Sequence, residues 1–191
     1  MRKLISFMHI SLDGFVAGLN GEMDWIKVDE EIFDYVGKRI SEGDTALYGR
    51  VTYQMMESYW PGAGDQPGAT RHDKQHSAWY NKVTKVVLSK TMQGVKLPNV
   101  QIISNDVANE IIKLKKAPGK DILIFGSPTA VHSLMKENLP DEYWLFVNPI
   151  LLGQGTSLFK DIRERTKLKF IASDTFSSGV VCLHYERKPD D

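Results

Sequence analysis

The sequence predicts an α/β fold in which a mostly parallel, twisted sheet is flanked by helices and ends in an antiparallel hairpin. Short apolar runs typical of strands buried on both faces alternate with segments whose apolar residues recur at helical spacing. The last two segments, 168–174 and 180–187, instead alternate polar and apolar residues around the turn sequence Ser177-Ser178-Gly179. A chain of 191 residues can bury a core without disulfides or metals, so we expect residues 1–191 to form a single domain.

The first half of the chain supplies two predicted strands, two helices and two loops. The strands are expected at 3–10 and 45–48, and the helices at 29–40 and 51–58. A glycine-punctuated loop runs from the end of the first strand to about residue 25, and it is the first candidate for substrate contact. The stretch 60–72 holds prolines and glycines that exclude a helix, so we expect a surface loop there.

The second half continues the alternation of strands and helices. A short helical turn is expected at 73–81, strands at 85–89 and 100–104, and a helix at 107–116. A further strand at 142–147 should end before Asn148-Pro149, because proline cannot donate to the ladder of a sheet.

The stretch 121–135 is the one around which we expect the chain to be organised. An apolar run at 122–125 stops at Gly126, and a helix must begin almost at once, with Ser127 as its cap and Pro128 in its first turn. Such a strand, turn and helix N-terminus present free backbone N–H groups and a helix dipole that can hold a phosphate. An ordinary strand-to-helix connection is the alternative.

Composition limits the function classes. Lys and Arg total 24 and Asp and Glu total 24, so a general affinity for nucleic acid or anionic membranes is disfavoured. The single cysteine, Cys182, cannot form an intramolecular disulfide, and the N-terminus lacks the long apolar core of a signal peptide. No segment approaches the ~20 apolar residues that cross a bilayer. We therefore expect a cytoplasmic protein whose partner is a small molecule, with no nucleic acid and no membrane.

Three predicted strands end in residues able to bind phosphate, and ligands of open α/β sheets lie beyond the carboxyl ends of the strands. These ends are Gly49-Arg50-Val51-Thr52, Ser89-Lys90-Thr91 and Gly126-Ser127-Pro128-Thr129. If Arg50 and Lys90 hold the 2′-phosphate of NADP at ~1.5 kcal/mol each, NAD should bind about a hundredfold more weakly. NADPH is therefore the expected cofactor. A surface ion pair for Arg50 and a solvated turn for Lys90 are the alternatives.

The usual Gly-x-Gly-x-x-Gly fingerprint of dinucleotide-binding proteins, with its ribose-binding acid, is missing. The sequence Gly153-Gln154-Gly155 is only superficially similar to it, and a tight turn is the alternative to a cofactor contact.

Several motifs resemble the dihydrofolate reductase-like superfamily, in the right order over nearly the whole chain. They are Ser-Leu-Asp-Gly at 11–14, Gly-Arg-x-Thr at 49–52, Val-Val-Leu-Ser-Lys-Thr at 86–91, Phe-Gly-Ser-Pro-Thr at 125–129 and Pro-Ile-Leu-Leu-Gly-Gln-Gly at 149–155. Within the superfamily, the chain is most similar to the reductase (C-terminal) domain of the bifunctional riboflavin-biosynthesis deaminase/reductase and its stand-alone bacterial relatives. In that family a glycine pair before the helix binds the NADPH pyrophosphate, and here Ser127 replaces the second glycine.

The resemblance implies an NADPH-dependent reductase of a pterin-like or ribosylated-pyrimidine-like molecule that forms a homodimer. The cofactor-binding residues that it indicates, together with the strand ends, are Gly49, Arg50, Thr52, Ser89, Lys90, Thr91, Gly126, Ser127, Thr129, Ala130, Gly153 and Gly155. It also implies that Asp13 contacts the substrate and that Trp25 forms part of the pocket wall. A non-catalytic nucleotide- or ligand-binding protein that retains the fold is the alternative.

The proton donor stays open at this stage. A general acid adds ~10²–10⁴-fold to a rate, and the candidate carboxylates near the expected pocket are Asp13, Asp24, Asp29 and Glu30. For Asp13, the alternative is a turn residue that hydrogen-bonds its own backbone. The pair His72 and His76 has metal-ligand spacing on a helix, but no third ligand follows at a convincing spacing, so we expect no metal.

Overall fold

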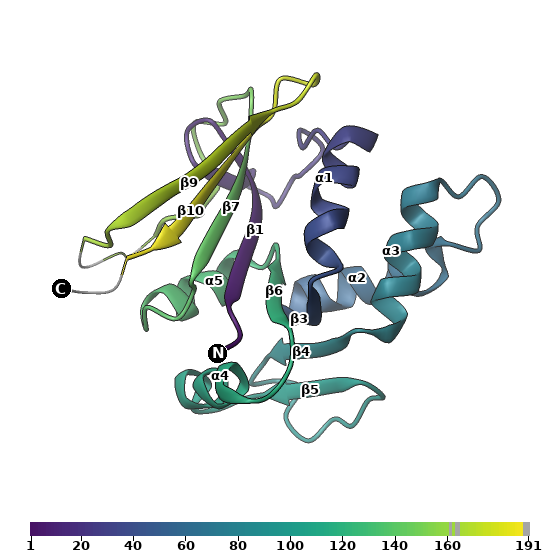
Figure 1. Ribbon diagram of the computed structural model, residues 1–191, viewed down its shortest axis with the longest axis vertical. Coiled ribbons are helices and arrows are strands. Elements are labelled where there is room, and N and C mark those ends of the chain that lie inside the picture. Colours follow the sequence, from purple (N-terminus) through teal and green to yellow (C-terminus); the bar gives the residue numbers. More distant parts are fainter. Residues whose placement is uncertain (161, 163–164, 189–191) are drawn as a thin grey trace.

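The computed structural model describes residues 1–160, 162 and 165–188. An eight-stranded sheet runs through these residues, and Figure 1 shows its course. The strand order is β5-β4-β3-β6-β1-β7-β10-β9. The strands are β1 (Leu4–Ser11), β3 (Gly43–Gly49), β4 (Thr84–Leu88), β5 (Val100–Ile103), β6 (Asp121–Phe125), β7 (Glu142–Asn148), β9 (Leu168–Thr175) and β10 (Val181–Arg187). Five neighbouring pairs are parallel, and β10 pairs antiparallel with both β7 and β9. The predicted fold class and the closing hairpin are confirmed.

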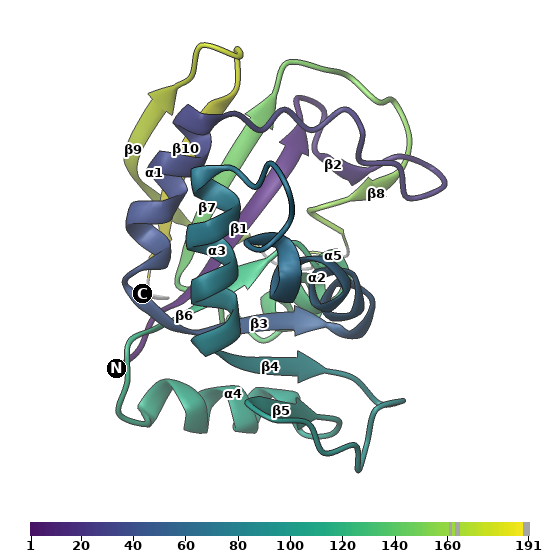
Figure 2. The same cartoon turned by 90° about the vertical axis from the view of Figure 1, so that its right-hand side faces the viewer.

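In the described part of the chain, five helices cover the two faces of the sheet. They are α1 (Glu30–Ile40), α2 (Arg50–Ala63), α3 (Arg71–Lys82), α4 (Val107–Lys116) and α5 (Pro128–Met135). Figure 2 shows α1 and α3 over the near face, and the packing clusters place α4 and α5 behind the sheet. Helix α4 has the predicted bounds, and Asp29 caps α1 by accepting a hydrogen bond from the Ile32 N–H at 2.9 Å.

The prediction of a loop at 60–72 is wrong at both ends. Helix α2 continues to Ala63 with Pro61 inside it, and α3 begins at Arg71. Proline removes one backbone N–H from α2, but contacts with α3 and the core support its last turn. The Pro61 carbonyl accepts a hydrogen bond from the Asn81 amide at 3.1 Å, and Ala63 is buried. The start of α3 is a capping box between Thr70 and Asp73, a local signal that the proline and glycine content concealed.

A second, two-stranded sheet lies beside the tip of β1 and has no counterpart in the prediction. It pairs β2 (Phe15–Ala17) with β8 (Thr156–Ser157) in antiparallel fashion, and both strands are visible side by side in Figure 2. Gly155 precedes β8 at φ 144°, and a Cβ there would overlap the backbone of Ala17. The close approach of the two chain segments therefore requires glycine at this position.

The core follows the alternation of side chains along the central strand β1. Leu4 and Met8 pack against the layer of α4 and α5, whereas Ile5 and Phe7 point to the opposite face, which α1 covers. A further cluster joins α2 and α3 to β3 and β4 on the α1 side. Because His9 follows Phe7 at an interval of two, its ring lies on the α1 face as well.

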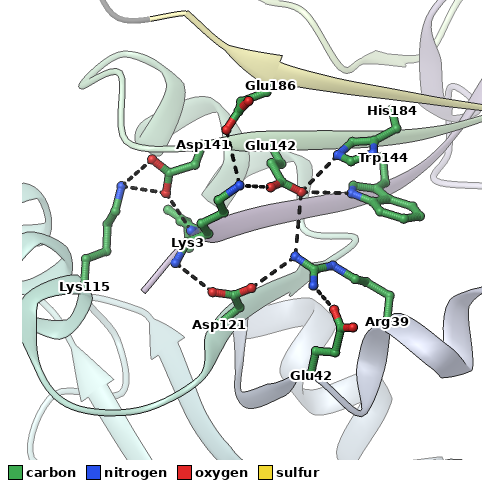
Figure 3. Close-up of polar contacts among 11 residues, drawn as sticks. Lys3, Arg39, Glu42, Lys115, Asp121, Asp141, Glu142, Trp144, His184 and Glu186 are labelled. Atoms are coloured by element: carbon green, nitrogen blue, oxygen red, sulfur yellow. Dashed lines mark hydrogen bonds and ion pairs between the residues drawn. The ribbon is translucent and has the colours of Figure 1, made fainter. Parts of the chain in front are cut away.

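Charged side chains concentrate at the edge of the sheet where β1, β6 and β7 begin (Figure 3). Glu142 is 4 % exposed and accepts hydrogen bonds from Lys3 at 2.5 Å and from His184 at 3.0 Å. Burial alone would raise the pKa of Glu142, but the hydrogen bonds from Lys3, Trp144 and His184 hold it below its ordinary value. Arg39 bonds Asp121 in the same network. These charges pair with one another, which marks this edge as structural.

The helices of the described residues are also too short or too polar to cross a lipid bilayer.

Candidate active site

The three strand ends singled out in the sequence lie next to one another. Strands β4, β3 and β6 are consecutive in the sheet and parallel, so their carboxyl ends share one edge. Gly49 pairs with Leu88, which places Arg50 and Ser89 one residue beyond adjacent strand ends. Residues that follow these strands, although far apart in the sequence, therefore lie at one edge of the sheet, where ligands of open α/β sheets bind.

A hydrogen bond joins the ends of β3 and β6 directly. The Ser127 hydroxyl accepts it from the Gly49 N–H at 2.7 Å, across 78 positions of sequence. Ser127 occupies the predicted N-cap position of α5, with Pro128 in the first turn, but its side chain makes no capping bond to α5 and instead accepts the hydrogen bond from Gly49 at the start of α2. Gly126 and Ser127 both adopt the left-handed backbone conformation, with φ angles of 60° and 59°. Glycine would adopt this conformation more readily than the serine at position 127.

Two helices begin at this edge, on opposite faces of the sheet. Helix α2 follows Gly49, and α5 starts with Pro128. The first N–H groups of each helix have no partner within the helix, and each N-terminus carries a partial positive charge. Together they form a region suited to an anion such as a pyrophosphate.

The remaining predicted cofactor residues differ in how exposed they are to solvent. Arg50, Lys90, Thr91 and Thr129 are exposed, whereas Ala130, in the first turn of α5, is buried. The Arg50 guanidinium donates to Gln54 at 2.9 Å, one turn along α2. The Ser89 hydroxyl closes its own turn by accepting from the Met92 N–H at 3.2 Å. Thr52 lies in the first turn of α2 beside Gly126, where its methyl group would touch an added Cβ at 3.6 Å.

A cavity of about 570 Å³ opens beside these helix ends, on the face covered by α1, α2 and α3. Three residues of the predicted cofactor set line it, namely Thr52, Gly126 and Ser127, and so does the neighbouring Pro128. The rest of the lining is mostly apolar or aromatic, including Phe7, Phe33, Tyr48, Met55, Trp60, Phe125 and Phe146. Among the described residues that line the cavity, none is an aspartate, glutamate, lysine or arginine.

Three histidines line this cavity, and sequence reasoning gave none of them a role there. Burial lowers the pKa of His9 to about 4, and burial together with the nearby His72 ring lowers that of His76 to about 3. His72 also has a lowered pKa, chiefly from burial, and stacks on Phe33 with 3.5 Å between ring centroids. At neutral pH the site therefore offers neutral imidazoles. Side chains of the predicted strand 3–10 alternate between its two faces, so Phe7 and His9 share a face. This alternation was the sequence signal for the side of the sheet on which His9 lies.

Asp13 and Trp25, the two predicted substrate residues, lie outside the cavity lining. The Asp13 carboxylate accepts hydrogen bonds from Leu152 N at 3.1 Å and Gly153 N at 2.7 Å, so it ties the loop before β8 to the loop after β1. The indole of Trp25 donates to the Glu22 carbonyl at 3.1 Å. The nearby Met23 and Ile26 supply the wall that Trp25 was expected to supply.

Gly153 and Gly155 belong to the loop that Asp13 holds. Gly153 adopts φ 73°, and Gly155 is fixed by the approach of Ala17 described above. The remaining candidate acids also lie outside the cavity lining: Asp29 caps α1, and Asp24 and Glu30 are exposed. Within the described part of the chain, no three metal-ligating side chains gather at one point, His72 and His76 included.

Comparison with known proteins identifies the family. The model of the RibD C-terminal domain matches residues 2–182, so the chain belongs to that family. Two Bacillus subtilis proteins are similar over almost their whole length. The uncharacterized protein YyaP is 35% identical over 189 residues, covering 96% of this chain and 94% of YyaP, and YwjB is 27% identical over 187 residues, covering 97% and 98%.

Solved structures share the fold. A putative riboflavin biosynthesis protein from Shewanella sp. PV-4 superposes with a TM-score of 0.71 and 25% identity, covering 97% of this chain and 98% of that one. A pyrimidine reductase-like protein from Corynebacterium diphtheriae gives a TM-score of 0.69 at 15% identity, over 99% and 93%. The Thermotoga maritima diaminohydroxyphosphoribosylaminopyrimidine deaminase/5-amino-6-(5-phosphoribosylamino)uracil reductase gives 0.66 at 15%, over 98% of this chain and 57% of that protein.

Proposed function

We propose that this protein is an NADPH-dependent reductase of a small pterin-like or ribosylated-pyrimidine-like heterocycle. One arrangement carries the proposal: the N-termini of α2 and α5 meet at the ends of β3 and β6, joined by the Ser127–Gly49 hydrogen bond, beside an apolar cavity. The helix ends suit the pyrophosphate of a dinucleotide, and the cavity suits the nicotinamide ring together with a planar substrate. The family and the reductase named in the Thermotoga maritima protein support the reaction class.

Different residues of this chain would bind the cofactor and shield the reacting rings from water. Gly126, Ser127 and the first turn of α2 would hold the pyrophosphate, and Arg50 with Lys90 would face the 2′-phosphate. The bound cofactor supplies a hydride. Hydride transfer needs two rings held in contact and shielded from water, and the aromatic wall of Phe7, Phe125 and Phe146 provides that shielding.

The test is NADPH oxidation followed by absorbance with a panel of pterins and ribosylated pyrimidines. We expect turnover with at least one member, and a rate lower by about tenfold or more when NADH replaces NADPH. Saturable NADPH binding with no oxidation by any member of the panel would favour the second candidate below.

The second candidate is a ligand-binding protein that retains the fold without turnover. One observation favours it: among the described residues, no carboxylate lines the cavity to serve as a proton donor. A reductase can instead take its proton from water, which is why the enzyme is our first proposal.

We also propose a homodimer that forms through the late strands. Strand β9 is an edge of the sheet and exposes Phe170 (55%) and Ile171 (40%). An open edge that carries apolar side chains is a ready surface for pairing with a second copy. Light scattering should give twice the 21.6 kDa mass of the chain, and a monomer mass would contradict this.

A further inference from the structure

The orientation of the Asn148 side chain determines which nitrogen of His9 carries the proton. Asn148 is fully buried at the end of β7, next to β1. Its carbonyl oxygen accepts a hydrogen bond from the Lys27 N–H at 2.8 Å, and its amide nitrogen faces the carbonyls of Phe146 at 3.1 Å and Ile10 at 3.4 Å. Since one end meets a donor and the other meets acceptors, the amide has one orientation.

The same amide nitrogen lies 3.4 Å from Nδ1 of His9. The amide nitrogen carries two hydrogens for three neighbouring acceptors, the two carbonyls and Nδ1, and it cannot itself accept. A hydrogen on Nδ1 would therefore point at a donor, which favours the neutral imidazole with its hydrogen on Nε2. The ring also stacks on Phe146 with 5.0 Å between centroids, which fixes its plane. Within the part of the chain that the structure describes, no group accepts a hydrogen bond from Nε2, and His9 lines the cavity. The cavity therefore contains an oriented hydrogen-bond donor.

The lining also limits the charge of the ligand. Its described residues include no side chain with a formal charge, and its histidines are neutral, so an anionic group placed away from the helix N-termini of α2 and α5 would lose its hydration without gaining a charged partner. A phosphate on the substrate is disfavoured for this reason. An uncharged ring with an acceptor atom would satisfy both the walls and the donor.

We propose that the cavity selects an uncharged planar heterocycle without a phosphate, and that His9 donates a hydrogen bond from Nε2 to an acceptor atom of the substrate, a carbonyl oxygen or a ring imine nitrogen. This inference rests on the proposed reductase function and narrows its substrate class. In the reaction, the hydride from NADPH adds to the carbon of the C=O or C=N bond, and the electron pair of that bond moves to the oxygen or nitrogen. His9 stabilises that atom by its hydrogen bond, and water supplies the proton that the atom takes up.

The experiment measures ligand binding without cofactor, by quenching of tryptophan fluorescence. The probes are quinoxaline, naphthalene, which lacks the ring nitrogens, and quinoxaline-6-carboxylate, which adds one negative charge. We expect the affinity ratio of quinoxaline to naphthalene to fall about five- to tenfold in His9→Phe, which keeps the stacking on Phe146, and to recover in part in His9→Gln. The carboxylate should bind at least tenfold more weakly than quinoxaline.

His76→Phe is the matched comparison, because His76 lines the same cavity and Asn148 does not contact it. It should keep the quinoxaline preference. A fall of the ratio in His76→Phe equal to that in His9→Phe, or less than a twofold fall in His9→Phe, would overturn the role of His9. Tighter binding of the carboxylate would overturn the exclusion of charge.

Nitrogen-15 NMR of the wild-type histidines at neutral pH tests the tautomer without any substitution, in case the variants fail to fold. The Nε2–H form of His9 is expected, and the Nδ1–H form would contradict the inference. The outcome of these binding and NMR tests can be distinguished from the outcome for the proposed reductase function. If the ligand preferences hold but NADPH is never oxidised, the reductase fails and the selective cavity stands, whereas turnover of a phosphorylated substrate overturns only the selectivity.

Discussion

The Ser127 hydroxyl accepts a hydrogen bond from the backbone N–H of Gly49 at 2.7 Å, which couples the turn after β6 to the first residue before α2. Two segments that would bind one pyrophosphate are thereby held at a fixed separation. The family resemblance implies a second glycine where Ser127 stands. The serine keeps the left-handed backbone at φ 59° and adds the connecting bond.

Substitutions at Ser127 separate the hydroxyl from the backbone conformation. Ser127→Ala loses the bond to Gly49 but keeps the left-handed strain, so the free energy of unfolding should fall by about 1 kcal/mol. Ser127→Gly also loses the bond but relieves strain of about 1 kcal/mol, which should leave it close to wild type. Urea unfolding of the three proteins measures this order. Equal stability of the alanine and glycine variants would show that the strain is absent.

Arg50 should discriminate between the two nicotinamide dinucleotides. Its guanidinium is exposed at the start of α2 and bonds only Gln54 among the described residues. Loss of one phosphate contact costs about 1.5 kcal/mol, so Arg50→Ala should weaken NADPH binding about tenfold and NADH binding less than twofold. Lys38→Ala, which removes an exposed cation from the end of α1, is the control. Equal losses for both dinucleotides would refute the assignment to the 2′-phosphate.

Asp13 should act by positioning the loop before β8. Hydrogen bonds from the Ser11 hydroxyl and from the backbone of Gly153 and Leu152 lower the pKa of Asp13, so these contacts weaken as the pH falls through that lowered value. Asp13→Asn replaces one accepting oxygen by a donor, and hydrogen exchange at the Leu152 and Gly153 amides should become at least several-fold faster. The exposed Asp24→Asn is the control, and unchanged exchange in Asp13→Asn would exclude the positioning role.

His9 should make the protein less stable in mild acid. Its pKa is about 4 in the folded chain and near 6.5 when unfolded, so between these values the unfolded chain binds the additional proton. Stability is then lost as the pH falls from 6.5 toward 4. Allowing for partial exposure to the cavity, the unfolding free energy of wild type relative to His9→Phe should fall by about 2 kcal/mol over this window. A difference that does not change with pH would contradict the neutral, buried state.

Local patterns were sufficient for most of the fold. Helix 107–116 and the closing hairpin were predicted nearly to the residue, because apolar periodicity and turn sequences act over a few positions. Strands β2 and β8 were missed because three and two residues carry no periodicity and their pairing joins distant segments. The continuation of α2 through Pro61 was missed because contacts with α3 outweigh the local preference.

The candidate site likewise has features that the sequence predicted and features that it did not. The meeting of the three strand ends follows from parallel topology, which the sequence predicted through its alternation of strands and helices. The partner of Ser127 could not be predicted, because Gly49 is 78 positions away. His9 was treated as an ordinary strand residue, since its importance depends on Asn148 and on a cavity whose walls come from several elements.

Calorimetric titration with NADPH tests the central claim that the ends of β3, β4 and β6 hold a dinucleotide. The account predicts saturable binding of one NADPH per chain at about micromolar affinity, with NADH about a hundredfold weaker. The absence of saturable binding at millimolar NADPH would contradict it.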